Sequence, residues 1–329
     1  MLSTFWTMTH THTMIVKEFI KLYAYELEDH PIVVHWDMDV AILKPMDDLY
    51  DAMLFPKDSP EGRAARSRLQ VQHPSRVLPD VIDAFMTRDI TSSQPWEKVQ
   101  GVQGGFLVNR HSKVDLETYV KFIKEGNYYP GRCATCGWAG LGYGGFQGAM
   151  AYQGAVAYFY DIFKPNTAVE LNVCKWNQVV ADVIWRGPDR MEHHMQCREY
   201  PLDGNFEANT QCEDCRITPI EEVNTVHYTA CKKPWECTIP HPRQTNNEKQ
   251  KYRLSHLTNI TTCGMLFSKW FELRQDFEDL LEKRTGVKPS QRDGNFEKDY
   301  FKGNCANPGR YIPMIPPPEG FDVKKLYGV

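Results

Sequence analysis

The sequence predicts an α/β fold, with a mainly parallel sheet and flanking helices. Apolar segments of strand length alternate with segments of helical period, which is the pattern of such folds. Two acidic residues, Asp37 and Asp39, directly follow the first predicted strand. Because ligands of these sheets bind beyond the carboxyl ends of the strands, we expect the functional residues there.

The elements can be placed along the chain from apolar spacing and from turn residues. The predicted helices cover 17–29, 46–53, 114–125, 149–163 (a helix or a buried segment) and 265–285, the last ended by Gly286. The predicted strands cover 32–36, 100–109 and 222–228. Polar or glycine-rich segments indicate loops, and these cover 56–80, 126–148, 186–216 and 239–256.

Three regions are expected in the 329 residues: an irregular N-terminus at 1–16, a main domain at 17–245, and a C-terminal helix with a Pro- and Gly-rich tail at 246–329. The net charge of -4 offers no basic stripe for nucleic acid. The chain contains no apolar run of about 18 residues, so no transmembrane helix is predicted. The first residues do not have the pattern of a signal peptide.

The acidic pair is typical of a site for a hard divalent cation. Carboxylate oxygens suit Mg²⁺ or Mn²⁺, which take their remaining ligands from phosphates and water. The alternative is a pair of solvated acids that cap a turn, but Trp36 and the apolar run after Asp39 place the pair near a core. Hydrolysis of the Asp-x-Asp-x-Glu kind is disfavoured because the third position is Ala41.

A second polar segment begins at His227, where another predicted strand ends. A neutral imidazole there can complete the coordination of the same metal, and Lys233 can reach diphosphate oxygens as a point charge. The alternative is a partly buried strand-end histidine beside a surface basic pair.

The ten cysteines favour an oxidising compartment, since eight of them lie from residue 174 to residue 305, mostly in loop-like sequence. The sequon at Asn259 supports the same compartment. Two C-x-x-C pairs, at 133–136 and 212–215, are compatible with a Cys₄ zinc site or with a redox pair. Disulfides that fix loops are favoured over both.

Taken together, these segments resemble glycosyltransferase family eight, the group that includes glycogenin. Four blocks carry the resemblance, in the family's order: the helix at 19–27 with IVVHWDMDVAILKPMDDLYD, QGGFLVNRHS at 103–112, YQGAVAYFY at 152–160 with Asn177 downstream, and HYTACKKPW at 227–235.

The resemblance implies a GT-A fold, a UDP-sugar donor, Mn²⁺ or Mg²⁺, retention of anomeric configuration and a Golgi or ER lumen. The acceptor, a glycan, protein or lipid, stays open. The residues that match the family's motifs are, for the metal, Asp37, Asp39 and His227; for the donor, Lys21 and Lys233; for the sugar pocket, Gln103, Gly104 and Gly105; and for catalysis, Gln153.

The chain departs from the family pattern at several positions. Gln103 replaces an asparagine, Tyr152 stands where an acid is expected, and Ala230 replaces a glycine. The family also places a nucleotide-binding strand-helix unit before the helix at 17–29, so we expect that unit, and a membrane anchor, upstream of Met1. These departures keep two alternatives open: an inactive lumenal protein with a transferase fold, and a zinc-stabilised interaction module.

Overall fold

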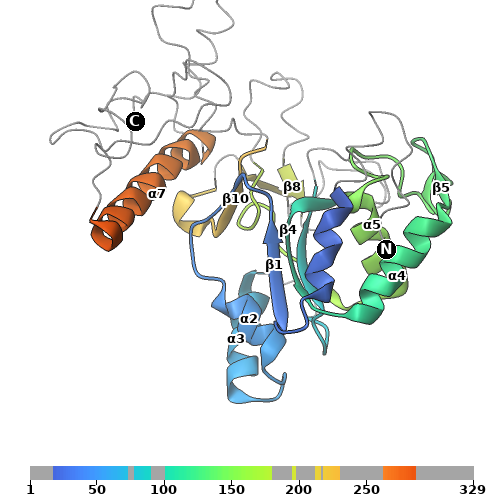
Figure 1. The fold of residues 1–329 in the computed structure, drawn as a ribbon, viewed down its shortest axis with the longest axis horizontal. Helices are drawn as coiled ribbons and strands as arrows, with labels where there is room; N and C mark the ends of the chain where they lie inside the picture. The colour runs from blue at the N-terminus through green and yellow to red at the C-terminus, as the bar shows by residue number, and fades with distance from the viewer. Residues whose placement is uncertain are drawn as a thin grey trace, which may run out of the picture.

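The computed structural model describes residues 18–72, 78–89, 101–179, 195–197, 212–215, 218–229 and 262–286. At its centre lies a four-stranded sheet that includes β1 and β4 (Figure 1). The order of its strands is β1-β4-β3-β7. Its strands are β1 (Ile32–Trp36), β3 (Ala84–Arg88), β4 (Val102–Arg110) and β7 (Ala168–Glu170). The mixed α/β class predicted from the sequence is therefore confirmed.

The direction of the strands differs from the expectation of a mainly parallel sheet. β4 runs antiparallel to both of its neighbours, β1 and β3, and the parallel pairing in this sheet joins β3 to β7. Apolar periodicity reports that a strand is buried and carries no information on its direction, so the sequence pattern could not reveal this reversal.

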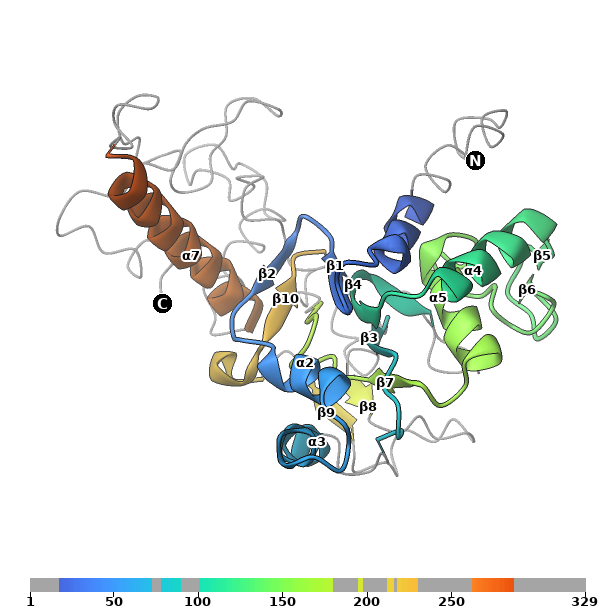
Figure 2. The same ribbon diagram turned by 60° about the horizontal axis from the view of Figure 1, so that its bottom comes forward.

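Helices cover both faces of the sheet (Figure 2). One face packs under η2 (Phe19–Glu26), α4 (Lys113–Glu125) and α5 (Tyr152–Tyr158), which continues as the π-helical turn η3 (Phe159–Phe163). The other face packs against α2 (Asp47–Leu54) and α3 (Pro60–Gln72). β4 serves both cores because side chains alternate along a strand: Leu107 faces the first, and Phe106 and Val108 face the second.

The helix α3 corrects the prediction that residues 56–80 form a surface loop. The Ser59 hydroxyl accepts a hydrogen bond from the Gly62 N–H at 3.0 Å, and Pro60 is the first helical residue. This is a serine N-cap followed by proline at the first position, a common start of a helix. Ala65 and Leu69, which are both fully buried, lie on the side of α3 that packs into the core.

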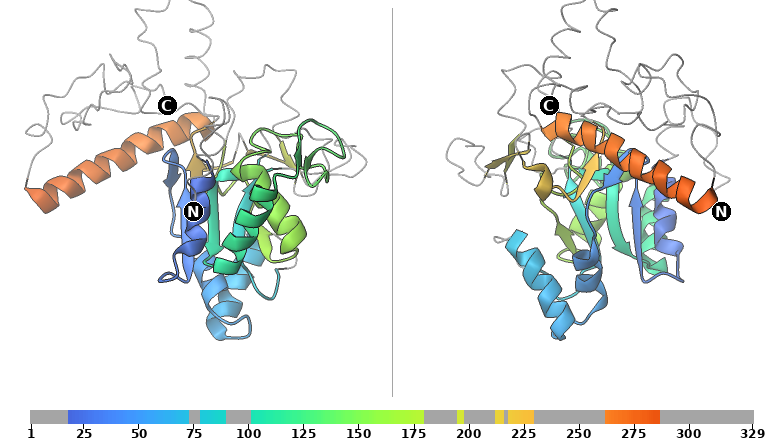
Figure 3. Two further views of the ribbon diagram at one scale, coloured as in Figure 1. Left: turned by 45° about the vertical axis from the view of Figure 1, so that its right-hand side comes forward. Right: turned by 90° about the vertical axis from the view of Figure 1, so that its left-hand side faces the viewer.

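A second, smaller sheet lies beside the first and pairs β2 (Val40–Ile42) with β10 (Thr225–His227) in antiparallel register. The short helix η7 (Ile220–Glu222) precedes β10. The predicted C-terminal helix is α7 (Thr262–Thr285), which packs on this sheet through Leu266 and extends away from it (Figure 3). The remaining short pairs are β5 (Tyr128–Tyr129) with β6 (Gly137–Trp138), and β8 (Met195–Cys197) with β9 (Cys212–Asp214).

Two disulfides, Cys133–Cys136 and Cys174–Cys215, are formed. They confirm the preference for disulfides and remove the Cys₄ zinc site, because three cysteines of the two C-x-x-C pairs are already oxidised. The bonds are consistent with a secreted or lumenal protein. None of the helices in the described ranges combines the length and the apolar character that crossing a membrane demands.

Candidate metal centre

The two aspartates lie in the turn that connects β1 to β2, at the junction of the two sheets. The Asp37 N–H donates to the Gly105 carbonyl at 2.9 Å, which ties the turn to β4. On the other side, the Asp39 carbonyl accepts from the Tyr228 N–H at 2.8 Å, directly after β10. Backbone bonds to both sheets therefore fix the turn, while the Met38 side chain between the acids is fully exposed.

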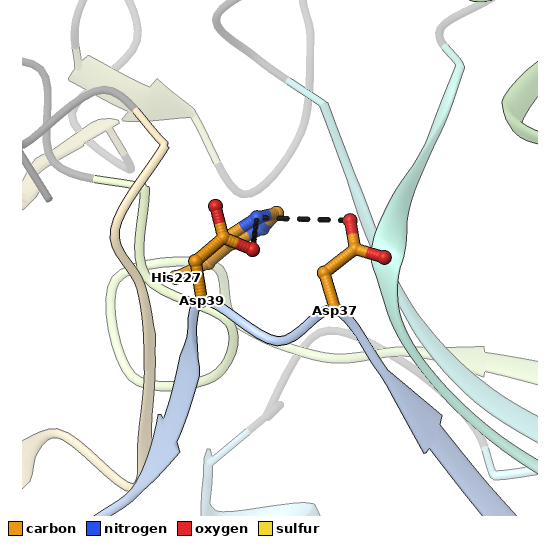
Figure 4. A group of neighbouring side chains, drawn as sticks. All are labelled: Asp37, Asp39 and His227. Atoms are coloured by element: carbon orange, nitrogen blue, oxygen red, sulfur yellow. Dashed lines mark ion pairs between the residues drawn. The ribbon is translucent and has the colours of Figure 1, made fainter. Parts of the chain in front are cut away.

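His227 ends β10 and brings its ring to the acidic pair (Figure 4). Its Nε2 lies 3.2 Å from the Asp39 Oδ1 and 3.9 Å from the Asp37 Oδ2. One ligand atom from each of the three residues lies within 4.8 Å of the other two. The convergence expected from the sequence is thus present, and two carboxylates with one imidazole form a donor set that fits Mn²⁺ or Mg²⁺.

The cluster is buried at one end and open at the other. The His227 side chain is 4% exposed and the Asp39 side chain 14%, whereas the Asp37 side chain is 34% exposed. Solvent or a ligand can therefore approach from the Asp37 side.

Lys21, on η2, contacts the cluster from this more open side. Its Nζ lies 2.7 Å from the Asp37 Oδ1 and donates to the Gly104 carbonyl at 2.9 Å. The ammonium also lies 5.5 Å from the centre of the Tyr152 ring. With both acids ionised, two carboxylates and one ammonium leave the cluster with a single net negative charge.

The predicted catalytic residue Gln153 lies at the start of α5, next to the glycines of β4. Its Oε1 accepts from the Gly104 N–H at 3.0 Å, and its Nε2 donates to the Gln147 carbonyl at 2.9 Å. These bonds tie the loop before α5 to β4 at Gly104, the same residue whose carbonyl accepts from Lys21.

Tyr152, at the position where the resemblance expects an acid, is completely buried. Its hydroxyl lies 2.8 Å from the Nε2 of His35. Burial, and secondarily the nearby Lys21 ammonium, lowers the pKa of His35 to about 3. The imidazole of His35 is therefore neutral at physiological pH.

Below the cluster lies a buried amide network that no sequence motif indicated. Gln103, expected in the sugar pocket, is 5% exposed, and its Oε1 contacts the His227 Nδ1 at 3.2 Å. Asn177, noted only as downstream of a family block, is fully buried and donates to the same oxygen. Its backbone φ of 48° is uncommon for a residue other than glycine, and no sequence signal marks it.

Some of the predicted residues lie outside the described residues. These are Lys233, Ala230, the sequon at Asn259 and the cysteines at 231, 237 and 305. The assignment of Lys233 to the donor therefore stays a prediction.

In comparisons with known proteins, no protein-family model, no curated protein and no solved structure matches the chain.

Proposed function

We propose that this protein is a metal-dependent glycosyltransferase that moves a hexose from a UDP-sugar to an acceptor, with retention of configuration. The observation that carries the proposal is the convergence of Asp37, Asp39 and His227 at a turn between two sheets. The resemblance of four sequence blocks to glycosyltransferase family eight supports it, and we propose a GT-A type of fold on the same basis.

The composition of the cluster favours a ligand that carries phosphate. Three protein groups leave about three positions of an octahedral ion for other oxygen ligands. The net charge of the cluster also supports a polyanion, because Lys21 offsets one of the two carboxylates. A divalent ion then leaves the site positive, and a diphosphate restores the balance.

In the proposed reaction, the protein's own residues hold and orient the donor. Asp37, Asp39 and His227 would hold the metal, which supplies Lewis-acid stabilisation of the negative charge on the leaving diphosphate. Lys21 lies close enough to share that charge, and Lys233 is expected to do the same. Gln153 and the backbone of Gly104 lie next to Lys21, since Gly104 is hydrogen-bonded to both side chains.

The test is Mn²⁺-dependent release of UDP from UDP-glucose and UDP-galactose by the purified full chain. We expect turnover by the wild type and a loss of at least about 100-fold in Asp39→Asn, since the variant removes a charge that the metal needs. Asp29→Asn is the matched control, because Asp29 is exposed and precedes β1. Absence of both Mn²⁺ binding and turnover in the wild type would refute the proposal.

A second candidate function is a non-catalytic lumenal protein that binds the nucleotide-sugar without turning it over. Burial of Tyr152 against His35, at the position of the expected acid, favours this alternative. The same experiment separates the two functions, because Mn²⁺ and UDP binding without any UDP release from either donor supports the non-catalytic protein. We propose the lumen of the Golgi or ER as the location for both, on the strength of the two disulfides.

A further inference from the structure

We infer that Gln103 is a positioning residue that fixes the ring tautomer of His227 and so directs the Nε2 of that ring at the carboxylates. The inference rests on the metal site of the proposed function. It places Gln103 behind the His227 ring, where it orients a metal ligand, rather than in a sugar pocket. It is carried by a chain of hydrogen bonds that begins at the backbone of β4.

The first link is the backbone N–H of Gly105, which can only donate. It lies 2.6 Å from the side-chain oxygen of Gln103, two residues earlier. A side-chain amide has one accepting end and one donating end, and its partners decide which end points where. The Gly105 N–H therefore requires the oxygen of Gln103 at this position.

The second link runs from this oxygen to the ring of His227. The Gln103 Oε1 lies 3.2 Å from the His227 Nδ1, and an oxygen that accepts there requires a proton on Nδ1. In the neutral ring, the Nε2 then carries the lone pair. That lone pair faces the Asp39 Oδ1 at 3.2 Å, a repulsive contact unless a cation lies between the atoms. A metal-binding histidine commonly has this arrangement, with its second nitrogen held by an outer acceptor.

Two further features hold Gln103 and the ring in place. The Asn177 side chain donates to the Gln103 Oε1 at 3.2 Å and to the Thr87 hydroxyl at 2.9 Å, so the amide of Asn177 is itself oriented. Gly105 also provides room, because a Cβ there would lie 2.2 Å from the His227 Cε1. A side chain at position 105 would push the ring away from the acids.

Three variants test whether the hydrogen-bond acceptor of Gln103 matters, or only the volume of its side chain. In Gln103→Met the volume is kept and the acceptor is lost, whereas Gln103→Glu keeps an acceptor. Gln70→Met, on α3, is the matched control for a glutamine-to-methionine change elsewhere. Mn²⁺ affinity of the full chain is measured by electron paramagnetic resonance of the free ion.

We expect Gln103→Met to bind Mn²⁺ about 10- to 100-fold more weakly than the wild type, the usual effect of losing an outer-shell partner. Gln103→Glu should bind within about threefold of the wild type or more tightly, since carboxylates are common partners in this position. Wild-type affinity in Gln103→Met would overturn the inference. Failure of the wild type itself to bind Mn²⁺ would instead overturn the metal site and with it the proposed function.

A second measurement tests the tautomer directly in the metal-free wild type. Nitrogen-15 NMR of the histidine rings in the wild type, at pH 8 with EDTA, distinguishes a protonated Nδ1 from a protonated Nε2. We expect the His227 ring, assigned by its loss in His227→Gln, to carry the proton on Nδ1. A proton on Nε2 would refute the inference even if every variant bound Mn²⁺ as expected.

Discussion

At the scale of single residues, Lys21 sets the charge of the candidate metal centre. Its ammonium lies 2.7 Å from a carboxylate oxygen of Asp37, and its side chain is only 17% exposed. A fixed positive charge at this distance opposes a divalent cation and favours a diphosphate. Metal binding and donor binding should therefore respond in opposite directions when this charge is removed.

We predict that Lys21→Met raises the affinity for Mn²⁺ alone by about tenfold, the size expected for one charge a few ångströms away in a largely aqueous dielectric. In the same variant, the affinity for UDP in the presence of Mn²⁺ should fall. Isothermal titration calorimetry measures both, and Lys121→Met, an exposed lysine on α4, is the control. Weaker binding of Mn²⁺ alone would show that Lys21 instead holds Asp37 in its binding position.

His35, which lies close to the same site, makes the stability of the fold depend on pH. The pKa of its imidazole falls to about 3 in the folded protein, mainly because the ring is buried, whereas a free histidine titrates near 6.5. The groups that face it are the Tyr152 hydroxyl and the Lys21 ammonium. Between these two pKa values the unfolded chain binds the extra proton, so acidification removes stability.

We predict that this proton costs up to about 1.4 kcal/mol of unfolding free energy for each pH unit below 6.5, with no further cost below pH 3. His35→Gln keeps a partner for the Tyr152 hydroxyl but does not titrate. Urea unfolding in EDTA, at steps from pH 7 to pH 4.5, should give a shallower pH dependence for the variant. Parallel curves for the two proteins would contradict the prediction.

The site residues also show what a sequence can predict. Asp37 and Asp39 were found from the strand before them, and His227 from its place at the end of another strand. The network of Gln103 and Asn177 was not found, because its members lie 74 positions apart and meet only through the pairing of distant segments. Neither the left-handed backbone of Asn177 nor the burial of Gln103 can be predicted from the residues that surround it in the sequence.

At the scale of elements, prediction succeeded where a local signal was present. Ser112 caps α4 by accepting from the Asp115 N–H, and Gly126 ends it in the left-handed conformation, which is the usual pair of helix boundaries. β7 was missed because three residues are too few to show a period. β3 was missed because its five residues, AFMTR, include only one β-branched residue, whereas the five residues of β1, IVVHW, include three. α3 was missed because its many polar residues suggested a loop, although Ser59 and Pro60 are typical of the start of a helix.

We predict that the start signal of α3 has a measurable effect on stability. Ser59→Ala should lower the free energy of unfolding by about 1 kcal/mol, because the Gly62 N–H loses its acceptor. Ser67→Ala, at an exposed position inside the same helix, should be neutral or slightly stabilising, since alanine is the better helix former. Equal effects of the two changes in urea unfolding would argue against the cap.

At the scale of the whole molecule, the Cys174–Cys215 disulfide lies beside the backbone that supports His227 in the candidate metal centre. Cys174 lies shortly before Asn177, which holds Gln103, and before Gln178, whose carbonyl accepts from the His227 N–H at 3.0 Å. The Gln178 side chain also donates to the Cys215 carbonyl at 3.0 Å. The disulfide therefore braces the backbone under the imidazole. Cys133–Cys136, in contrast, closes a loop whose ends are three residues apart.

We predict that the two disulfides differ in their effect on the metal. Replacing Cys174 and Cys215 by alanine should lower stability by about 4 kcal/mol, the entropic value for a loop with a 41-residue separation, and should also weaken Mn²⁺ binding. Replacing Cys133 and Cys136 should cost about half as much and leave Mn²⁺ affinity unchanged. Urea unfolding in EDTA and Mn²⁺ titration of each folded variant give the two quantities. If replacing either pair lowered Mn²⁺ affinity equally, the loss of affinity would be explained by general destabilisation of the fold. If only the first pair does so, the link between Cys174 and Cys215 is part of what holds His227 against the two acids.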